Sequence, residues 1–290
     1  WSLGKSLERE QKQHLSNQED IKSIVYSINE KLDADDKASV PLISLYSTNR
    51  AVVSVPLRVR KQHKFDQIAA LESSLLGKRE ESDFKLFFEW FRNREDVENE
   101  LFRTAQREGQ HYDGDPQLNA VRAAIHAMMP GFSSPQVKRQ PSLHMVIKKG
   151  DEKFKIQDLS DGEKCLLALV GDMARRIAMA NPSAPNPLEA EAVFLIDEIE
   201  LHLHPAWQRM VVPRLLEVFP NAQFFVTTHS PQVLGEVKDT GSIWFMKPGE
   251  PIARKKYSLQ ELLAQCDASA PLSEEDATWT ASPARGGELI

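Results

Sequence analysis

This sequence has little cysteine, no long apolar run and no excess of positive charge. Its 290 residues include two cysteines, Cys165 and Cys266, which lie far apart and show no metal-ligand spacing. That usage fits the reducing cytoplasm better than a disulfide framework. No run of eighteen or more apolar residues occurs, and no basic and apolar N-terminus with a cleavage site is visible. We therefore expect a cytoplasmic protein with no membrane span.

The charge balance limits the function classes further. Lys and Arg together number 36 against 42 Asp and Glu, which gives a net charge of −6. This balance argues against a general nucleic-acid coat, although it leaves room for a local basic patch. Apolar residues make up 41% and charged residues 27% of the chain, as in ordinary globular proteins. A chain of this length can form one large domain or two modest ones.

The first half of the chain predicts a helix, then strands, then more helices. Apolar residues at helical spacing favour a helix over 18–33 in a polar N-terminal arm, and two β-rich runs follow over 40–60. A helix over 116–129 is expected to begin at Pro116. Residues 65–109 are helical in pattern, with six apolar residues largely on one face: Phe84, Phe87, Phe88, Phe91, Val97 and Leu101.

From residue 142 the pattern becomes a hairpin and then alternating helices and strands. Residues 142–148 and 153–157 alternate around Lys-Gly-Asp-Glu, which predicts a β-hairpin. The first expected element is a helix that follows the Ser-Asp-Gly turn at 160–162 and runs to about 180. After it we expect a strand over 192–196, a helix over 205–219, a strand over 222–227, a helix opened by Ser230-Pro231 and a strand over 242–247. Both 192–196 and 222–227 look like buried strands, and the uniformly apolar run 193–196 is typical of a strand covered on both faces. We expect the polar residues 267–290 to be poorly ordered.

Two adjacent carboxylates, Asp197 and Glu198, follow the apolar run Val-Phe-Leu-Ile. Ligands of open α/β sheets bind at the carboxyl ends of strands, and Asp197 there could hold Mg²⁺, which prefers hard oxygen ligands. Successive strand residues face opposite ways, so Glu198 would be aimed differently and could orient or deprotonate a water. Taken alone, the pair is equally well explained as two solvated acids at a strand end.

A second candidate is the turn Leu-Ser-Asp-Gly-Glu-Lys at 159–164. Ser160 and Gly162 lie where a helix begins, where free N–H groups form an anion site and glycine lets a phosphate approach closely. The alternative is a capping box, with Ser160 as N-cap and Glu163 three residues later. The two interpretations are compatible, and the cap is favoured when the turn is taken alone.

His229 follows the second apolar strand, after Phe-Phe-Val-Thr-Thr. A histidine at such a strand end can hydrogen-bond a phosphate oxygen or an attacking water, although most isolated histidines do neither. Its place one strand after Asp197 and Glu198 allows both strand ends to open on one site.

In this order, the three segments resemble the nucleotide-handling motifs of ABC-type ATPases. Residues 159–164 resemble the signature motif, 193–198 the Walker B strand and 227–230 the histidine switch. The segment Ile-Glu-Leu-His-Leu-His-Pro-Ala-Trp-Gln from Ile199 is similar to the D-loop region of SMC-like and OLD-like bacterial ATPases. Three shorter features resemble the insertion of the subgroup that includes PtuA, the ATPase of Septu anti-phage systems and of allied retrons: Tyr46-Ser-Thr-Asn-Arg50, Phe88-Glu-Trp-Phe-Arg92 and Glu95-Asp96.

The resemblance, which covers about 40–260, implies a fold, cofactors and a role for each site residue. The fold would be α/β, an ABC-ATPase-like P-loop NTPase lobe with a mostly helical insertion. Asp197 would serve Mg²⁺, Glu198 would be the general base and His229 would sense the γ-phosphate of ATP. In this family each signature motif completes the site of a partner, so ATP would hold a head-to-tail homodimer together. The residues that would bind the partner's nucleotide are Ser160, Asp161, Gly162 and Glu163.

The phosphate-binding loop that this family places first, G-x-x-x-x-G-K-[ST], is absent from the sequence. Gly4-Lys5-Ser6 matches its last three letters, but no strand precedes it and the residues after it are too polar for a buried helix. We therefore expect that about a hundred or more residues, with that loop, precede Trp1 in the whole protein. Without such a loop nucleotide binding would be crippled.

We expect four segments in the chain. They are a polar helical arm (1–37), a strand-plus-helical insertion (38–141), an ATPase lobe with the three motifs (142–265) and a disordered tail (266–290). Within the ATPase lobe, His202 and His204 form a His-x-His pair beside two acids, which is one arrangement of metal ligands. The resemblance implies instead that both are structural residues of the D-loop, and we favour that interpretation.

Several functions compete. The resemblance implies an ATPase that controls a partner nuclease, an HNH protein, with a reverse transcriptase and its DNA–RNA product as further partners in a retron. An OLD-type nuclease is disfavoured because only about sixty residues follow His229, too few for a nuclease domain of ordinary size. An SMC-like or OLD-like DNA-repair ATPase is a further alternative. A nucleotide-gated scaffold with little turnover is the last, but it would have no need of Glu198 as a base.

Two basic clusters could contact a nucleic-acid backbone. One comprises Arg58, Arg60, Lys61, His63 and Lys64. The other comprises Arg92, Arg94, Arg103 and Arg107. The alternative for the second cluster is a solvated face with interleaved acids, namely Glu89, Glu95, Asp96 and Glu98.

Overall fold

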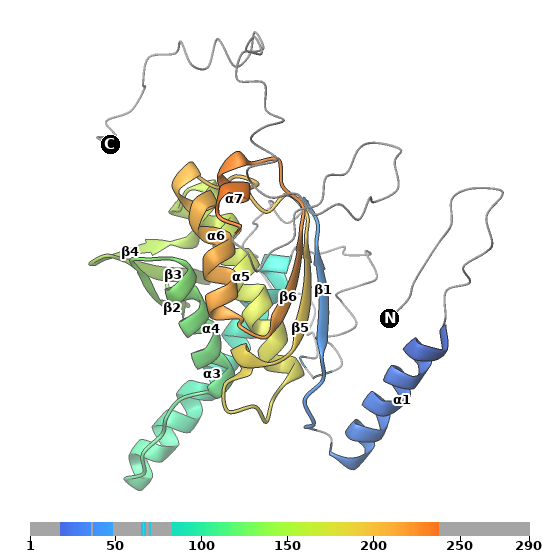
Figure 1. Cartoon of the computed structure of the whole chain (residues 1–290). Coiled ribbons are helices and arrows are strands. Elements are labelled where there is room, and N and C mark those ends of the chain that lie inside the picture. The colour runs from blue at the N-terminus through green and yellow to red at the C-terminus, as the bar shows by residue number, and fades with distance from the viewer. Residues whose placement is uncertain are drawn as a thin grey trace, which may run out of the picture. The chain divides into compact units, whose positions relative to one another are not determined.

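The computed structural model of the chain describes residues 18–35, 37–48, 65, 67, 70 and 83–237 (Figure 1). Some of the predictions lie outside these residues: Gly4-Lys5-Ser6, the β-rich run 51–60, the cluster of Arg58, Arg60 and Lys61, the strand over 242–247 and the tail. Helix α1 comprises Gln18–Ala34, which confirms the helix predicted over 18–33. Among the described helices, none is both long and apolar enough to cross a membrane.

Within the described residues, three parallel strands form the sheet that carries the motif residues. They are β1 (Leu42–Tyr46), β5 (Ala192–Ile196) and β6 (Ala222–Val226), in the spatial order β1-β5-β6. The strand predicted over 192–196 is confirmed, and the one over 222–227 ends one residue early. Because all three strands run the same way, their carboxyl ends lie at one edge of the sheet.

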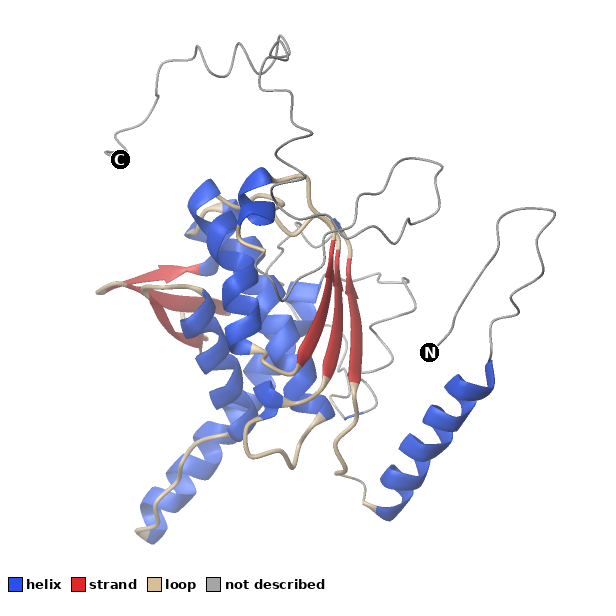
Figure 2. Ribbon diagram, viewed as in Figure 1, coloured by secondary structure: helices blue, strands red, loops and turns tan. Residues whose placement is uncertain are grey.

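The two faces of this sheet differ in burial. Phe194 and Ile196 of β5 lie on the covered face and are at most 2% exposed, and Phe194 stacks on Phe224 with 5.6 Å between the ring centroids. On the opposite face Phe225 is 53% and Leu45 42% exposed. On this face Val193 and Leu195 of β5 are half-buried, so the predicted cover of strand 192–196 on both faces is incomplete among the described residues, whose sheet-packing helices lie on one side (Figure 2). The prediction of a buried strand over 222–227 is wrong, because every residue of β6 is partly or fully exposed.

Helix α5 (Asp161–Ala180) packs on the covered face of the sheet and runs through the centre of the core. All its residues from Cys165 onward are buried, so the helix is enclosed rather than amphipathic. Gly171 lets helix α3 (Asp83–Glu108) approach closely, because a Cβ built there would lie 2.8 Å from the ring of Phe87. The helix predicted to follow the Ser-Asp-Gly turn and to run to about 180 is confirmed, with its first residue at Asp161.

A buried ion cluster joins β1 to α5. The fully buried carboxylate of Asp172 accepts hydrogen bonds from Arg175 Nη2 at 2.6 Å and from Arg176 Nε at 2.5 Å. The hydroxyl of Tyr46, the last residue of β1, donates to the same carboxylate at 3.0 Å. Buried charges are tolerated only with such partners, so this cluster fixes where β1 ends relative to α5.

Helix α3 buries only some of the apolar residues predicted to share one face. Phe84, Phe87, Phe88 and Phe91 are at most 1% exposed, as the predicted apolar face requires. Farther along the helix, Val97 is 48% and Leu101 47% exposed. The prediction that they share the apolar face is therefore wrong for these two residues, because successive residues of a helix turn by about 100° and both point well away from the four phenylalanines.

A second, antiparallel sheet contains β2 (Phe132–Lys138), β3 (His144–Lys149) and β4 (Glu152–Lys155), in that order. The β3–β4 hairpin confirms the predicted one, but β2 is a strand that the sequence does not predict. Its pairing with β3 is irregular between Ser133 and Gln136, and Ser134 adopts a left-handed φ of 51°. This irregularity, next to a proline, hides the period of two that would identify a strand.

The remaining helices each begin with a capping side chain followed by proline. They are α4 (Pro116–Met128), α6 (Pro205–Val218) and α7 (Pro231–Gly235), with Asp115, His204 and Ser230 as their N-caps. Proline suits this first position because its missing N–H would have no partner there. The predicted helix starts at Pro116 and at Ser230-Pro231 are confirmed.

Candidate nucleotide site

Main-chain hydrogen bonds hold the loops after β5 and β6 together. The N–H of Thr227 donates to Ile196 O at 2.9 Å, and the N–H of Ile199 donates to Thr227 O at 3.1 Å. On the other side, the N–H of Asp197 donates to the carbonyl of Tyr46 at 2.8 Å. The pairing of the sheet thus continues beyond the strands and brings the residues after β5 and β6 to the same edge.

The hydroxyl of Thr227 connects the two acids at this edge. It donates to Asp197 Oδ1 at 2.5 Å and accepts the N–H of Glu198 at 2.8 Å. One side chain from the β6 loop therefore fixes both the carboxylate of Asp197 and the backbone of Glu198.

Glu198 has a strained backbone, with φ at +46° in the left-handed region. A residue with a Cβ adopts this conformation at a cost of about 1–2 kcal/mol, and such strain is common at functional sites. Strand β5 ends at Ile196, so the direction of the Glu198 side chain follows this turn. The sequence-based expectation that strand alternation sets the direction of the Glu198 side chain is therefore wrong, because Glu198 lies outside the strand.

Glu200 is the residue of this edge that the sequence does not single out. Its Oε2 accepts the hydroxyl of Thr228 at 2.7 Å, and its Oε1 accepts the main-chain N–H of His229 at 2.6 Å. The imidazole of His229 is exposed at the same edge. The only signal in the sequence is the position of Glu200, two residues after Glu198.

Gln208 of α6 ties the same loops together from a second side. Its Nε2 donates to Leu203 O at 2.8 Å, and its Oε1 accepts the hydroxyl of Ser230 at 2.6 Å. Because Ser230 caps α7, helix α6 fixes the start of α7 directly after His229.

The turn at 159–164 forms the predicted capping box at the start of α5. Glu163 Oε2 accepts the N–H of Ser160 at 2.9 Å, and the N–H of Glu163 donates to Ser160 Oγ at 3.4 Å. Partial burial acts to raise the pKa of Glu163, but the ammonium of Lys149 at 2.7 Å and the N–H of Ser160 outweigh it and lower the pKa. Asp161 is exposed and pairs with Lys164 at 2.7 Å, which lowers the pKa of Asp161.

Gly162 lies against the loop that follows β5. A Cβ built on Gly162 would lie 2.4 Å from the main-chain O of His202, a residue whose own φ is +63°. The glycine is therefore required by a contact within the chain, whether or not a phosphate approaches it as well. The capping turn, the acids after β5 and the histidine after β6 thus form one continuous arrangement.

His204 acts as a helix cap, because its Nδ1 accepts the N–H of Ala206 at 3.3 Å at the start of α6. No group of three His, Cys, Asp or Glu that could hold a metal ion occurs within the described residues. Mg²⁺ typically binds one or two carboxylates and takes its other ligands from phosphates and water. The donor set around Asp197 therefore fits a Mg²⁺ that arrives with a nucleotide rather than one held by the chain alone.

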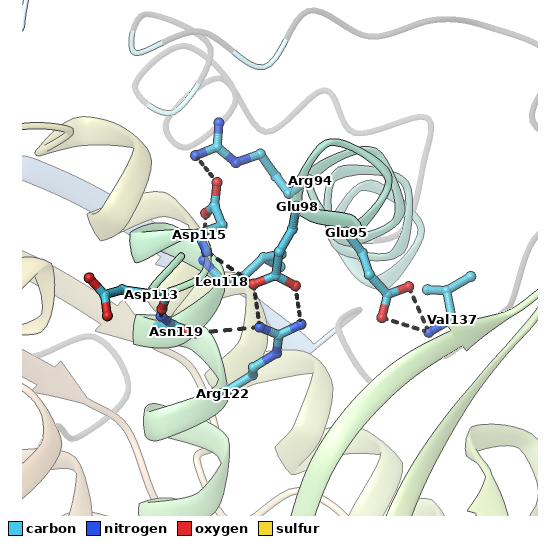
Figure 3. A network of polar contacts seen from close by, with 9 residues as sticks. All are labelled: Arg94, Glu95, Glu98, Asp113, Asp115, Leu118, Asn119, Arg122 and Val137. Carbon is cyan, nitrogen blue, oxygen red and sulfur yellow. Dashed lines mark hydrogen bonds and ion pairs between the residues drawn. The ribbon is translucent and has the colours of Figure 1, made fainter. Parts of the chain in front are cut away.

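Arginines and acids of α3 and α4 pair with one another, as Figure 3 shows. Arg94 Nη2 lies 2.7 Å from Asp115 Oδ2, and Arg122 Nη2 lies 2.7 Å from Glu98 Oε2. The charge of Arg94 is thus paired within the protein, although its partner Asp115 is not one of the interleaved acids named for this cluster. Arg103 and Arg107 of the same cluster are exposed.

Comparison with known proteins gives the family. Residues 14–235 match the protein family described as "AAA domain, putative AbiEii toxin, Type IV TA system". The chain belongs to this family. AAA-domain membership agrees with the parallel sheet and its helical cover, and it identifies the fold as the α/β P-loop NTPase type that the motifs predict.

Relatives of this AAA-domain chain include the two groups that the motifs resemble. The "Retron Ec83 probable ATPase" of Escherichia coli is 32% identical over 272 residues, which is 75% of this chain and 49% of that protein. The Septu protein PtuA of Bacillus mycoides (strain KBAB4) is 39% identical over 111 residues, or 38% of this chain and 15% of that protein. The resemblance predicted from the motifs is therefore confirmed, and the chain spans about half the length of the curated retron relatives it matches.

Among solved structures, the AAA-domain chain aligns with one from work on ATP-driven dimerisation and DNA-stimulated activation of SMC ATPases. The alignment covers 58% of this chain and 93% of the other, at 22% identity and with a TM-score of 0.39.

Proposed function

We propose that this chain is part of an ATP-hydrolysing subunit of an anti-phage defence complex. Its family and its similarity to retron and Septu ATPases support the proposal. The observation that carries it is the hydrogen-bonded edge where Asp197 contacts Thr227 and Glu200 contacts His229. Phosphoryl transfer to water requires an acid that binds the metal, a base and a polar group that faces the phosphates. This edge can supply all three.

Each residue at the edge has its own role in this proposal. Asp197 holds Mg²⁺, which when bound neutralises negative charge on the phosphates. Glu198, aimed by its left-handed turn, orients the attacking water and accepts its proton. His229 donates a hydrogen bond to the γ-phosphate. The phosphate-binding loop is proposed to come from sequence before Trp1 in the full-length protein.

The proposal also assigns partners. The exposed start of α5, with Ser160 and Gly162, contacts ATP bound to a second subunit, so that two subunits associate head to tail around the nucleotide. Similarity to Septu PtuA and to a retron ATPase supports a defence system with further protein partners. The controlled partner that we propose is a nuclease of the HNH type. In a retron, a reverse transcriptase and its DNA–RNA product would be further partners.

ATP turnover by the full-length protein tests the proposed function. We expect Glu198→Gln to lower kcat by about 100-fold or more, because an amide cannot accept the proton of the attacking water. Nucleotide binding should persist, since the variant keeps the shape of the side chain. Glu108→Gln, at the exposed end of α3, is the matched control and should leave kcat unchanged. Equal and low turnover in the wild type and Glu198→Gln would favour a nucleotide-gated scaffold.

A further inference from the structure

We propose that Glu200 is a positioning residue that holds His229 in place for the nucleotide. This inference rests on the proposed function. Its basis is the bidentate contact of one carboxylate with two consecutive residues of the β6 loop, the hydroxyl of Thr228 at 2.7 Å and the N–H of His229 at 2.6 Å. Hydrogen bonds to an ionised carboxylate are roughly twice as strong as neutral ones, so the pair can fix the main chain of that loop.

Glu200 is itself held firmly enough to serve as a support. Its carbonyl accepts the N–H of Leu203 at 2.8 Å, and the N–H of the preceding Ile199 donates to Thr227 O at 3.1 Å. The carboxylate therefore extends from a hydrogen-bonded turn on the β5 side to a loop on the β6 side. A group held this way transmits the position of one loop to the other.

The contact reaches beyond His229 to the start of α7. Thr228 Oγ1 donates its hydrogen to Glu200 and accepts the N–H of Ser230 at 3.0 Å. Ser230 is the N-cap of α7. Glu200 thus orders the segment from the end of β6 to the first turn of α7, with His229 at its centre.

The same turn also contacts the signature segment. His202, two residues after Glu200, places its carbonyl against Gly162, where a Cβ would lie at 2.4 Å. A displacement of the turn at 159–164 would therefore also displace Glu200, which holds His229. This gives the signature segment and the histidine of one chain a direct physical connection.

Steady-state kinetics with ATP distinguish positioning from mere stabilisation. We expect Glu200→Ala in the full-length protein to lower kcat by about 10- to 100-fold with little change in KM, because a group displaced by about 1 Å contributes less to the transition state. Glu200→Gln keeps one acceptor and should lose less. Glu217→Ala, an exposed acid on α6, is the control and should retain wild-type kcat.

A double variant tests whether Glu200 acts through His229. If it does, Glu200→Ala should have little further effect on kcat in a His229→Ala background. Multiplied losses in the double variant would overturn the inference, and so would a normal kcat for Glu200→Ala when His229→Ala is impaired. If neither His229→Ala nor Glu198→Gln alters turnover, the proposed ATPase function itself fails.

Amide hydrogen exchange tests the contact without ATP turnover. The His229 amide should exchange at least about 10-fold faster in Glu200→Gln or Thr228→Val than in the wild type, whereas Thr228→Ser should restore protection. Because these substitutions change few atoms, the variants should fold even if Glu200→Ala does not, and the contact can still be tested. Unchanged exchange in both variants would overturn the inference.

Discussion

Gly162 shows how the absence of one side chain sets the distance between two loops. The main-chain O of His202 occupies the space that a Cβ would need, at 2.4 Å. His202 is itself in the left-handed region, with φ at +63°, and the N–H of Leu203 next to it is bonded to Glu200 O at 2.8 Å. The carbonyl therefore cannot retreat without disturbing the turn that supports Glu200.

Gly162→Ala should consequently destabilise the protein. We expect the free energy of unfolding to fall by about 1–3 kcal/mol, the usual cost of forcing extra atoms into packed structure. Denaturant unfolding monitored by circular dichroism measures this change. Gly235→Ala is the matched control, because a Cβ there meets no atom within 4 Å, and it should leave stability nearly unchanged. Equal stability of both variants would mean that the His202 loop moves aside freely.

Residues of the site differ in how visible they are in the sequence. Asp197 and His229 can be found because each follows an apolar run that ends a strand. The contacts of Thr227 and Glu200 cannot be found this way, because their partners lie 30 and 28 positions away, at Asp197 and Thr228. Those contacts exist only because β5 and β6 pair in one register, which no local pattern encodes.

Among the elements, helix α3 carries two acids with opposite electrostatic behaviour, both visible in Figure 3. Burial acts to raise the pKa of Glu98, but Arg122 and the N–H of Asp115 outweigh it and lower the pKa. For Glu95, burial is the largest effect and raises the pKa, although the N–H of Val137 and nearby arginines oppose it. Ionised Glu98 therefore stabilises the α3–α4 contact, whereas ionisation of Glu95 lowers the stability of the folded protein.

The two acids predict opposite dependences of stability on pH. The pKa of Glu98 in the folded state lies below the unfolded value of 4.5, so its stabilising effect is present above pH 4.5 and disappears as pH falls through the folded pKa. Glu98→Gln should cost about 1–3 kcal/mol at pH 7, since Arg122 loses a charged partner, and less as the solution is acidified. Urea unfolding curves at a series of pH values measure the difference from wild type.

Glu95→Gln serves as the matched control on the same helix. The pKa of Glu95 is raised in the folded state. Its contribution to the stability of the protein is therefore present below pH 4.5 and is lost as pH rises through the folded pKa. Its amide variant keeps an oxygen to accept the N–H of Val137 and removes the buried charge, so at pH 7 it should be at least as stable as wild type. A loss at pH 7 as large as that of Glu98→Gln would contradict this assignment.

Elements with a clear apolar period are predicted well, and irregular ones are not. Strand β5 occupies the predicted residues 192–196, and α5 begins within two residues of its predicted start. Strand β2 escapes prediction because the irregularity between Ser133 and Gln136 breaks its alternation. For α3, periodicity indicates the face that the four phenylalanines bury, but Val97 and Leu101 lie off that face and are exposed.

Across the whole molecule, residues from two predicted segments share one hydrophobic core. Phe87 from the segment 38–141 packs against Gly171 from the segment 142–265, and both belong to the covered side of the parallel sheet. The division into those segments stays a proposal. Strand β1, which lies far from β5 in the sequence, pairs directly with it, and sequence patterns do not reveal such a long-range neighbour.

Association of two whole subunits around ATP is the remaining consequence of the proposed function. Ser160 is exposed at the start of α5, and its side chain serves as the N-cap of that helix. Asp and Asn are N-caps as good as Ser, so Ser160→Asp and Ser160→Asn should both preserve the helix and the thermal stability. The two variants differ in charge, and only the carboxylate would repel a phosphate brought by a second subunit.

We expect Ser160→Asp to abolish ATP-induced dimerisation and Ser160→Asn to retain it. Both substitutions are made in full-length Glu198→Gln, in which slow hydrolysis preserves the bound ATP, and the mass of the particle is measured by light scattering with ATP and Mg²⁺. A repulsive charge at a few ångströms from a phosphate costs several kcal/mol when water is excluded, which exceeds the roughly 1.4 kcal/mol needed for a tenfold change in affinity. ATP binding by the monomer should be equal in the two variants, because in the proposed dimer the signature segment of a chain contacts only the nucleotide bound by its partner. Dimerisation of Ser160→Asp at wild-type ATP concentrations would show that α5 does not face a partner's nucleotide.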